Sequence, residues 1–392
     1  MELNYKEAIF GAIPAHWEMG SISDCTEIVT DYVANGSFAS LKENVKYLSS
    51  PDYAVLIRLV DHNNGFNGNF VFIDEHSYNF LRKSKLIGGE IIISNVGANV
   101  GTVFKCPELP YKMSLAPNSI MVKFKGVNDF YYYWLKSDAG QFMLKSIVSG
   151  SAQPKFNKTD FRRLIVPMPP IDEQHAISNI MSALDHKISL NTKINHHLEQ
   201  IAQAIYKSWF VDFEPWGGVM PNNWNLRRLG EFFPVITGKM NANISSDKGK
   251  YPFFSCSQNI AWTNQYSFDG KAVLVAGNGD FNVKWYDGKF EAYQRTYVLM
   301  PYDGHLLAFL YYATQDGLER ITSAARGSVI RFITKGNIEN HEIAVPDNLA
   351  DLSVIQILQD LNEQIAYNIK ESSSLAALRD TLLPRLMSGK LL

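Results

Sequence analysis

One stretch of the chain, residues 172–207, runs for 36 residues without a proline or a glycine. Nothing in it interrupts an α-helix, because those two residues are the usual breakers. Within it, one set of residues recurs at alternating steps of four and three, which keeps one stripe of a helix turned toward a partner helix. The stripe consists of Ile177, Met181, Leu184, Ile188, Asn191, Asn195, Leu198, Ala202 and Ile205. We therefore expect a long helix that pairs in the manner of a coiled coil.

The same stripe recurs 177 residues further along the chain. Its members are Val354, Leu358, Leu361, Ile365, Asn368, Ser372, Leu375, Arg379 and Leu382. Both stripes are polar at their centres, where a buried Asn pair fixes register because a slipped register leaves an amide unpaired. We predict an antiparallel pair of helices, each about 54 Å long, with Asn191 close to Asn368. The predicted helix-pairing residues are Leu184, Ile188, Asn191, Leu198, Leu361, Ile365, Asn368 and Leu375. The alternative is a pair of ordinary amphipathic surface helices with solvated Asn side chains.

The segments between these helices are also duplicated. The echoes are Pro14–Trp17 with Pro221–Trp224, Phe156 with Phe332, Ile165–Pro167 with Ala344–Pro346, and the aromatic helix starts at Phe130 and His305. We infer a tandem duplication with a period near 180 residues, each unit being a globule followed by a long helix. The predicted segments are 1–170 and 211–346 for the globules, and 171–210 and 347–392 for the helices.

Each globule is expected to be mixed α/β, which makes the fold class α+β with a pseudo-two-fold plan. In the first globule, short β-rich runs stand between turn residues, and an aromatic stretch has helical spacing. The predicted strands are Ala54–Val60, Gly89–Ser94, Gly101–Lys105 and Ser119–Phe124, and the predicted helix is Asp129–Ser149.

Composition restricts the function further. A length of 392 residues fits two domains with their own cores, and a net charge of −2 leaves any nucleic-acid surface to local basic patches. Cys25, Cys106 and Cys256 show no CxxC or metal-ligand spacing, which fits a reduced, cytoplasmic compartment. We see no signal peptide and no apolar run long enough to span a membrane.

Catalytic motifs are missing from the sequence. It has no GxxxxGK[ST], GxSxG or HExxH, and no Asn-Pro-Pro-aromatic tetrapeptide of the kind that amino-methyltransferases use. Asp172 and Glu173 at the start of the first long helix are better explained as helix-cap and dipole partners than as an acid–base pair. We therefore expect no catalytic residue, no metal site and no cofactor in this chain.

Two basic loops, 145–163 and 320–335, occupy equivalent places in the duplicated units. Glycine and serine let backbone approach phosphate, cations release counterions, and amide side chains read base edges. One such loop would read as a solvated loop, but two equivalent ones favour DNA. The candidates in these loops are Gln153, Lys155, Asn157, Lys158, Arg326, Ser328 and Arg331. Further candidates in Gly-Asn loops are Asn95, Asn99, Asn278 and Lys284.

Over essentially its full length, the chain resembles the specificity subunits of type I restriction–modification systems. The order and duplication of the motifs carry this resemblance. They are Pro14–Trp17 and Pro221–Trp224, Gly150-Ser151 with Phe156-Asn157-Lys158, Pro169–Gln174 at the start of the first long helix, and the closing Leu383–Gly389. The second long helix follows Pro346–Asp351 without a Glu-Gln pair, which leaves its starting residue open.

The resemblance implies a non-catalytic, DNA-binding subunit with two target recognition domains separated by two long antiparallel coiled-coil helices. Each domain would read half of an interrupted sequence in double-stranded DNA, and the helices would set the gap. The partners implied are two methylation subunits, which bring S-adenosylmethionine, and in a complete system two restriction subunits that use ATP and Mg²⁺. For the methylation subunits, Trp209 and Phe210 are the expected contacts. Two other readings stay open, a free-standing DNA methyltransferase and a coiled-coil scaffold that binds only protein.

Overall fold

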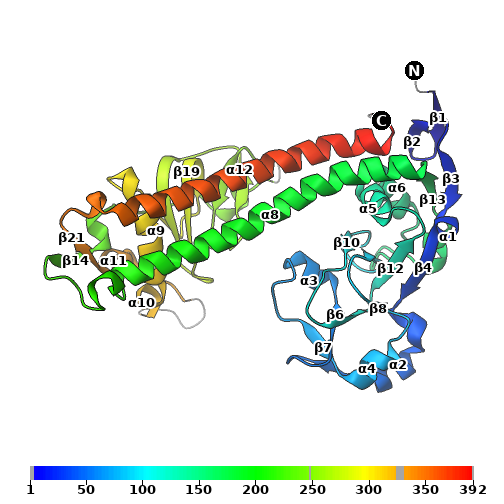
Figure 1. Ribbon diagram of the computed structural model, residues 1–392, viewed down its shortest axis with the longest axis horizontal. Helices are drawn as coiled ribbons and strands as arrows, with labels where there is room; N and C mark the ends of the chain where they lie inside the picture. Colours follow the sequence, from blue (N-terminus) through cyan, green and yellow to red (C-terminus); the bar gives the residue numbers. More distant parts are fainter. Residues whose placement is uncertain (1–3, 247–248, 324–330, 391–392) are drawn as a thin grey trace. The chain divides into compact units, whose positions relative to one another are not determined.

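The computed structural model describes residues 4–246, 249–323 and 331–390. They form two compact units, and each contains one globule together with parts of both long helices (Figure 1). Unit 1 comprises Met1–Ile188 and Ser373–Leu392, and unit 2 comprises Ser189–Ser372. The predicted segment boundaries, which treat the helices as separate from the globules, stay a prediction.

A four-stranded antiparallel sheet of order β10-β9-β12-β4 forms the centre of unit 1. Its strands are Val103–Lys105, Ile91–Ser94, Ser119–Phe124 and Thr26–Asp31 in that order. Helix α5 (Asn128–Lys136) packs on β10 and β12 and buries Phe130 and Trp134 completely. A separate two-stranded ladder pairs β3 (Glu18–Ser21) with β13 (Ile165–Met168).

Unit 1 also carries a second sheet, of order β5-β7-β6-β11-β8, inserted between β4 and β12. Its strands are Tyr47–Leu48, Val71–Ile73, Ala54–Ile57, Lys112–Leu115 and Lys85–Leu86. The remaining elements of unit 1 are β1 (Tyr5–Ala8), β2 (Gly11–Pro14), α1 (Ile22–Cys25), η1 (Tyr32–Asn35), α2 (Phe38–Asn44), α3 (Leu59–Asn63), α4 (Glu75–Phe80), α6 (Asp138–Ser146) and α7 (Lys158–Arg163).

Unit 2 is built on one six-stranded sheet of order β15-β20-β18-β19-β16-β17. Its strands are Val235–Thr237, Thr296–Leu299, Phe268–Ala276, Val283–Ala292, Tyr251–Phe254 and Ala261–Thr263. A two-stranded ladder pairs β14 (Trp224–Arg228) with β21 (Glu342–Pro346). The remaining elements are η2 (Glu214–Trp216), η3 (Leu229–Glu231), η4 (Ala242–Ile244), η5 (Gly304–Leu306), α9 (Leu307–Asp316), α10 (Leu318–Ser323), α11 (Lys335–Glu339) and η6 (Leu349–Asp351).

The two units repeat one plan. The order β10-β9-β12-β4 in unit 1 corresponds to β19-β18-β20-β15 in unit 2, and the ladder β3–β13 corresponds to β14–β21. Helix α9 packs on β18 and β19 as α5 packs on β12 and β10. The prediction of a duplicated α+β fold with long helices is confirmed. The units differ mainly in their inserts, the five-stranded sheet in unit 1 and the extra strands β16 and β17 in unit 2.

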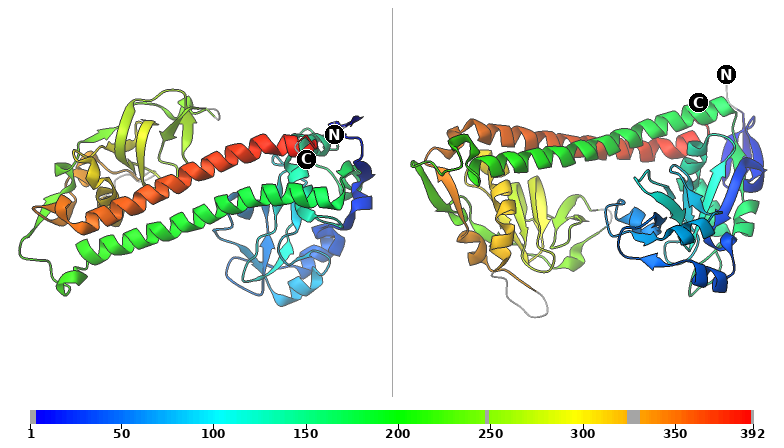
Figure 2. Two further views of the ribbon diagram at one scale, coloured as in Figure 1. Left: turned by 45° about the horizontal axis from the view of Figure 1, so that its top comes forward. Right: turned by 60° about the horizontal axis from the view of Figure 1, so that its bottom comes forward.

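The long helices α8 (Ile171–Phe210) and α12 (Ser353–Met387) run side by side in opposite directions (Figure 2). Within unit 1, the Arg379 guanidinium contacts the Asp185 carboxylate at 2.9 Å. Within unit 2, Asn195 Nδ2 donates to the Ile365 carbonyl at 3.3 Å. Residue numbers fall along α12 as they rise along α8, as an antiparallel pair requires.

The polar centre of the helix pair lies within unit 2. Asn191 is fully buried, and its Nδ2 donates to the Glu371 carboxylate at 2.7 Å, to Ser372 Oγ at 3.2 Å and to the Asn368 carbonyl at 3.4 Å. Asn368 Nδ2 donates to Asn195 Oδ1 at 2.8 Å. Ile365 and Asn368 are buried, and the other predicted pairing residues are half-buried, namely Leu184, Ile188, Leu198, Leu361 and Leu375.

Two predicted elements are wrong in extent. The predicted helix over 129–149 is two helices, because Ser137 has extended backbone and its side chain caps α6 by accepting from the Gly140 amide at 3.3 Å. The predicted strand Ala54–Val60 ends at Ile57, since Arg58 and Asp61 form a capping box that starts α3.

Candidate nucleic-acid interface

Three backbone segments of unit 1 meet beyond the end of β9: the loop after β9, the turn before β12, and the strand-like segment before α7. The Asn95 amide donates to the Asn118 carbonyl at 3.1 Å, and the Phe156 amide donates to the Asn95 carbonyl at 3.1 Å. The Gly97 amide donates to the Pro154 carbonyl at 2.9 Å. Gly97 has a φ of +101°, a conformation that glycine adopts without strain. We call this meeting point the three-segment joint.

Unit 2 contains the same joint. The Gly277 amide donates to the Arg295 carbonyl at 2.9 Å, and the Ile333 amide donates to the Gly277 carbonyl at 3.0 Å. The Gly279 amide donates to the Arg331 carbonyl at 3.1 Å. The hydrogen-bond pattern therefore equates Asn118 with Arg295, and Pro154 with Arg331.

This alignment corrects one predicted echo. The equivalent of Phe156, which is 3% exposed, is Ile333, also 3% exposed, and not Phe332, which is 39% exposed. The sequence comparison favoured Phe332 because it matched residue type, whereas the structure conserves burial. One residue later, Asn157 and Thr334 are the N-cap residues of the short helices α7 and α11.

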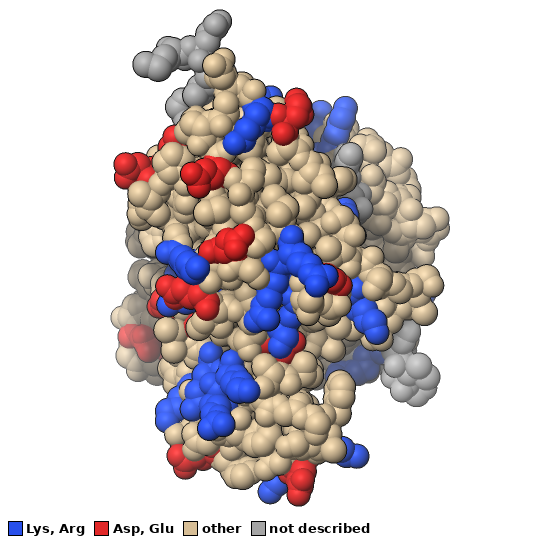
Figure 3. Space-filling view, turned by 90° about the vertical axis from the view of Figure 1, so that its right-hand side faces the viewer, with Lys and Arg blue, Asp and Glu red and all other residues tan. Residues whose placement is uncertain are grey.

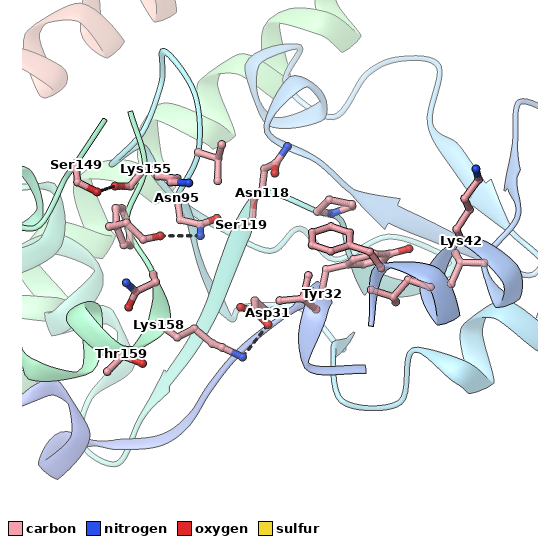
Figure 4. Close-up of a pocket in the computed structure, with 18 of the residues that line it drawn as sticks. Asp31, Tyr32, Lys42, Asn95, Asn118, Ser119, Ser149, Lys155, Lys158 and Thr159 are labelled. Atoms are coloured by element: carbon pink, nitrogen blue, oxygen red, sulfur yellow. Dashed lines mark hydrogen bonds and ion pairs between the residues drawn. The ribbon is translucent and has the colours of Figure 1, made fainter. Parts of the chain in front are cut away.

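The joint of unit 1 opens into a cleft of about 980 Å³. Figure 4 shows Asn95, Asn118, Lys155 and Lys158 around this cleft, with Tyr32 and Lys42 on the side of the inserted sheet. Much of its lining is apolar or aromatic: Tyr32, Val33, Phe38, Leu41, Val45, Tyr47, Val96, Pro117 and Phe156. Apolar walls with amide and ammonium groups at the edge suit contact with bases and phosphates.

The joint of unit 2 opens into a smaller groove of about 440 Å³. It is lined by Thr237, Gly277, Gln294, Arg295, Tyr297, Phe332, Ile333, Thr334 and Lys335. Two cationic side chains and one amide side chain stand in this groove, so its chemistry is more polar than that of the cleft in unit 1.

The structure brings four of the DNA candidates in unit 1 together at the cleft, namely Asn95, Lys155, Asn157 and Lys158. Lys158 is paired with the Asp31 carboxylate at 2.8 Å, and Asn157 Oδ1 accepts from the Asp160 amide at 2.9 Å, so both have structural partners. Lys155 is exposed at the rim. The other two candidates, Asn99 and Gln153, are exposed but do not line the cleft.

Asn95 holds the joint together and faces the cleft. Its Nδ2 donates to the Phe156 carbonyl at 3.0 Å, which adds a side-chain bond to the backbone bonds already described. Its Oδ1 is buried and has no hydrogen-bond partner among the residues that the structure describes.

In unit 2 the predicted candidates are more scattered. Arg331 Nη2 donates to the Thr322 carbonyl at 3.0 Å, and Asn278 forms a β-bridge with Phe332. Lys284 donates to the Ser257 carbonyl at 2.8 Å and to Asn282 Oδ1, and burial lowers the pKa of its ammonium group. Arg326 and Ser328 lie outside the described residues.

Sequence reasoning missed Asn118, Gln294, Arg295 and Lys335. A signal was present: Asn118 and Arg295 are 177 positions apart, the interval that separates Asn191 from Asn368. They directly precede the first residues of β12 and β20. Applying the helix interval to the turns would have paired these two residues.

One predicted partner contact is wrong. Phe210 is 4% exposed and packs in the core of unit 2, with its ring centroid 5.4 Å from that of Trp224. Trp209 is half-buried and meets Trp216 edge-on at 5.3 Å. Phe210 therefore stabilises unit 2 and offers no surface to a second protein.

Charge on the surface is local, as the net charge requires. Figure 3 shows Lys and Arg side chains gathered in small groups, with Asp and Glu between them, on an otherwise uncharged face. No helix among residues 4–246, 249–323 and 331–390 is long and apolar enough to cross a membrane. Within the same residues, no group of three His, Cys, Asp or Glu side chains could hold a metal ion.

A duplicated α+β globule, with one joint and one groove in each copy and an antiparallel helix pair, defines a two-site recognition protein. The chain belongs to the family described as the type I restriction modification DNA specificity domain, which matches residues 14–200 and again 221–375. The resemblance drawn from the sequence is thereby confirmed, and DNA sequence recognition is the function of this family.

Individual relatives agree with the family. The chain is 25% identical to the type I restriction enzyme MjaIX specificity subunit of Methanocaldococcus jannaschii, over all of this chain and 97% of that protein. It is 40% identical over 150 residues to the EcoDI specificity subunit of Escherichia coli, covering 38% of this chain and 33% of that protein. The fold is similar to the crystal structure of a type I S subunit from M. genitalium, with a TM-score of 0.58 at 16% identity over 98% of both chains.

Proposed function

We propose that this chain is the non-catalytic specificity subunit of a type I restriction–modification complex, in which each unit reads one half of an interrupted DNA sequence. One observation carries the proposal: the three-segment joint occurs once in each unit, with the same backbone hydrogen bonds. A protein with two equivalent but chemically different grooves is suited to a sequence with two different halves.

The groups at the two joints support DNA as the ligand. Exposed ammonium and guanidinium groups contact phosphates and fix the position of the duplex, whereas amides and arginines that reach base edges select the sequence. Lys155 at the cleft and Arg295 at the groove are exposed cations of this kind. Binding should weaken with salt, because each phosphate contact releases counterions.

We assign the helices the role of a ruler. Helix α8 has 40 residues and α12 has 35, which correspond to about 60 Å and about 52 Å at about 1.5 Å per residue. Two readers of the same face of B-DNA work about 34–36 Å apart or at multiples of that distance. Inserting one heptad into each helix should therefore lengthen the gap between the half-sites by about three base pairs, since it adds about 10 Å.

The partners proposed are two methylation subunits, which bind S-adenosylmethionine and transfer its methyl group to adenine. Restriction subunits that use ATP and Mg²⁺ would join them in a system that also cleaves DNA. The exposed side chains of α8 and α12 outside the helix seam are the proposed docking surface. Within this proposal the chain itself holds no cofactor.

The test is adenine-methylation mapping of host DNA by long-read sequencing, with and without the gene for this chain. A two-part, interrupted motif that disappears on deletion and returns on complementation would support the proposal. A methylation pattern that does not change, in cells shown to express the methylation subunits, would contradict it.

A second measurement separates the alternatives. The chain is purified with its methylation subunits and titrated with DNA. A complex that assembles but binds no DNA would favour the protein scaffold. Binding of S-adenosylmethionine by the purified chain alone would favour a free-standing methyltransferase.

A further inference from the structure

The turn that leads into the central strand of each sheet carries a different side chain at the same place in each unit. In unit 1 it is Asn118, directly before Ser119 of β12, and in unit 2 it is Arg295, directly before Thr296 of β20. Ser119 and Thr296 are buried, at 3% and 1% exposure. The joint therefore holds both turns by the same bonds and places the two unlike side chains at one structural position.

Both side chains are free to meet a ligand. Asn118 and Arg295 are exposed, and so is Gln294 beside Arg295. Among the residues that the structure describes, no hydrogen bond or ion pair engages the Arg295 guanidinium or the Asn118 amide side chain. Figure 4 shows the Asn118 side chain at the edge of the cleft.

The other cations near the grooves have partners. Lys335 pairs with the Glu339 carboxylate at 3.2 Å, Arg331 donates to the Thr322 carbonyl, and Lys158 pairs with Asp31. Arg295 is thus the arginine of the unit 2 groove whose planar fork is available in the part of the chain that the structure describes.

The turn in unit 2 is seated firmly. A Cβ atom at Gly277 would lie 2.4 Å from the Arg295 carbonyl oxygen and 3.0 Å from the Tyr297 ring, so the backbones touch at this point. The Cys256 thiol also donates to the Arg295 carbonyl, at 3.5 Å. Because the backbone of Arg295 is fixed, its side chain can select a base without ordering a loop on binding.

We propose that Arg295 and Asn118 are the specificity-determining residues of the two units, with Arg295 reading a guanine in one half-site and Asn118 reading an adenine in the other. The guanidinium fork matches O6 and N7 of guanine, and an Asn amide matches N6 and N7 of adenine, both in the major groove. The inference rests on the proposed function and adds to it the residues and the bases.

The experiment compares the methylation motif produced by the complete complex of this chain with its methylation subunits, for wild type and for Arg295→Ala, Arg295→Lys and Asn118→Ala. Arg295→Ala should make one guanine of one half-site degenerate, with loss of discrimination on the order of ten- to a hundredfold. Arg295→Lys should behave in the same way, because it keeps the charge but loses the fork. Asn118→Ala should relax one adenine in the other half-site.

The matched control is Arg227→Ala, which removes another exposed arginine of unit 2 that pairs with Glu231 and does not line the groove. It should leave the motif unchanged, and thermal melting checks that every variant folds. If Arg295→Ala weakens methylation at all sites without relaxing any base, or if Arg295→Lys restores the wild-type motif, Arg295 contacts phosphate and the inference is overturned. If the wild-type complex produces no two-part motif, the proposed function itself fails.

Discussion

Replacing Asn191 by leucine tests how the polar centre of the helix pair contributes to stability. Asn191 is 0% exposed, and its Nδ2 donates to the Glu371 carboxylate, to Ser372 and to the Asn368 carbonyl. Its Oδ1 is buried without a partner among the described residues. The substitution therefore removes one satisfied group and one unsatisfied group together.

The two effects have different sizes. Removing the unpartnered Oδ1 recovers about 1–3 kcal/mol, and burying the leucine side chain adds about 1.5–3 kcal/mol. Losing a hydrogen bond to a charged acceptor costs about 1.5–3 kcal/mol, and Glu371 is only half-buried, so water can replace the lost donor. The net expectation is a gain of about 1 kcal/mol in the free energy of unfolding of unit 2.

Differential scanning calorimetry measures the result. A domain of 150–250 residues shifts its Tm by about 2–4 °C per kcal/mol, and unit 2 spans Ser189–Ser372. The same variant should loosen the register of the helix pair, which would broaden the gap length in the methylation motif. A lower Tm together with an unchanged gap would refute the reasoning, because it would show that the hydrogen bonds of Asn191 outweigh its unpartnered oxygen.

Three further substitutions have defined outcomes. Arg379→Met should destabilise unit 1 by about 1 kcal/mol, and the loss should shrink in about 1 M NaCl, because the pair with Asp185 is only partly buried; urea titration at two salt concentrations measures it. Burial raises the pKa of the Glu199 carboxyl above its unfolded value, so its contribution to stability is present at low pH and lost as pH rises from about 4.5 through the folded pKa; Glu199→Gln should flatten that profile in pH-dependent thermal melts. Arg331→Ala should weaken binding to one half-site only, which competition with DNA altered in either half measures.

The helices and the duplication could be predicted from the sequence because both follow from spacing. A stripe with a period of 3.5 residues can be read over 36 residues, and its repetition 177 residues later identifies two equivalent units. The break at Ser137 could not be read in the same way, because the aromatic spacing on its two sides continues across the cap.

The recognition residues were harder to predict because basic residues in a loop have two uses. Lys158 and Arg331 carry the expected charge, but tertiary partners occupy them. Arg295 stands outside the basic runs, and only the hydrogen-bond alignment with Asn118 places it at the groove. Local composition finds charged segments, whereas the fold decides which charges stay exposed.

The two units also differ where each globule meets its own helix, and this difference makes a last prediction. In unit 1, Tyr133 donates to the Asp185 carboxylate at 2.8 Å, and Arg379 neutralises that carboxylate. The repeat interval relates this bond to one in unit 2, where Tyr312 donates to Asn362 Oδ1 at 2.9 Å. Asn362 is 2% exposed, and Ala202 stands at the position equivalent to Arg379.

The substitution Asn362→Asp should therefore destabilise unit 2 at neutral pH by about 3 kcal/mol, since it buries a carboxylate without a cation. The acid should have a raised folded pKa, so the loss should vanish below the unfolded pKa of about 3.9 and grow as pH rises through the folded pKa. Adding Ala202→Arg should recover part of the stability at neutral pH, although the longer side chain must fit a packed position. Thermal melts of the two variants at about pH 4 and about pH 7 decide the matter. Equal stability of Asn362→Asp and wild type at neutral pH would mean that the charges at the two helix contacts are interchangeable.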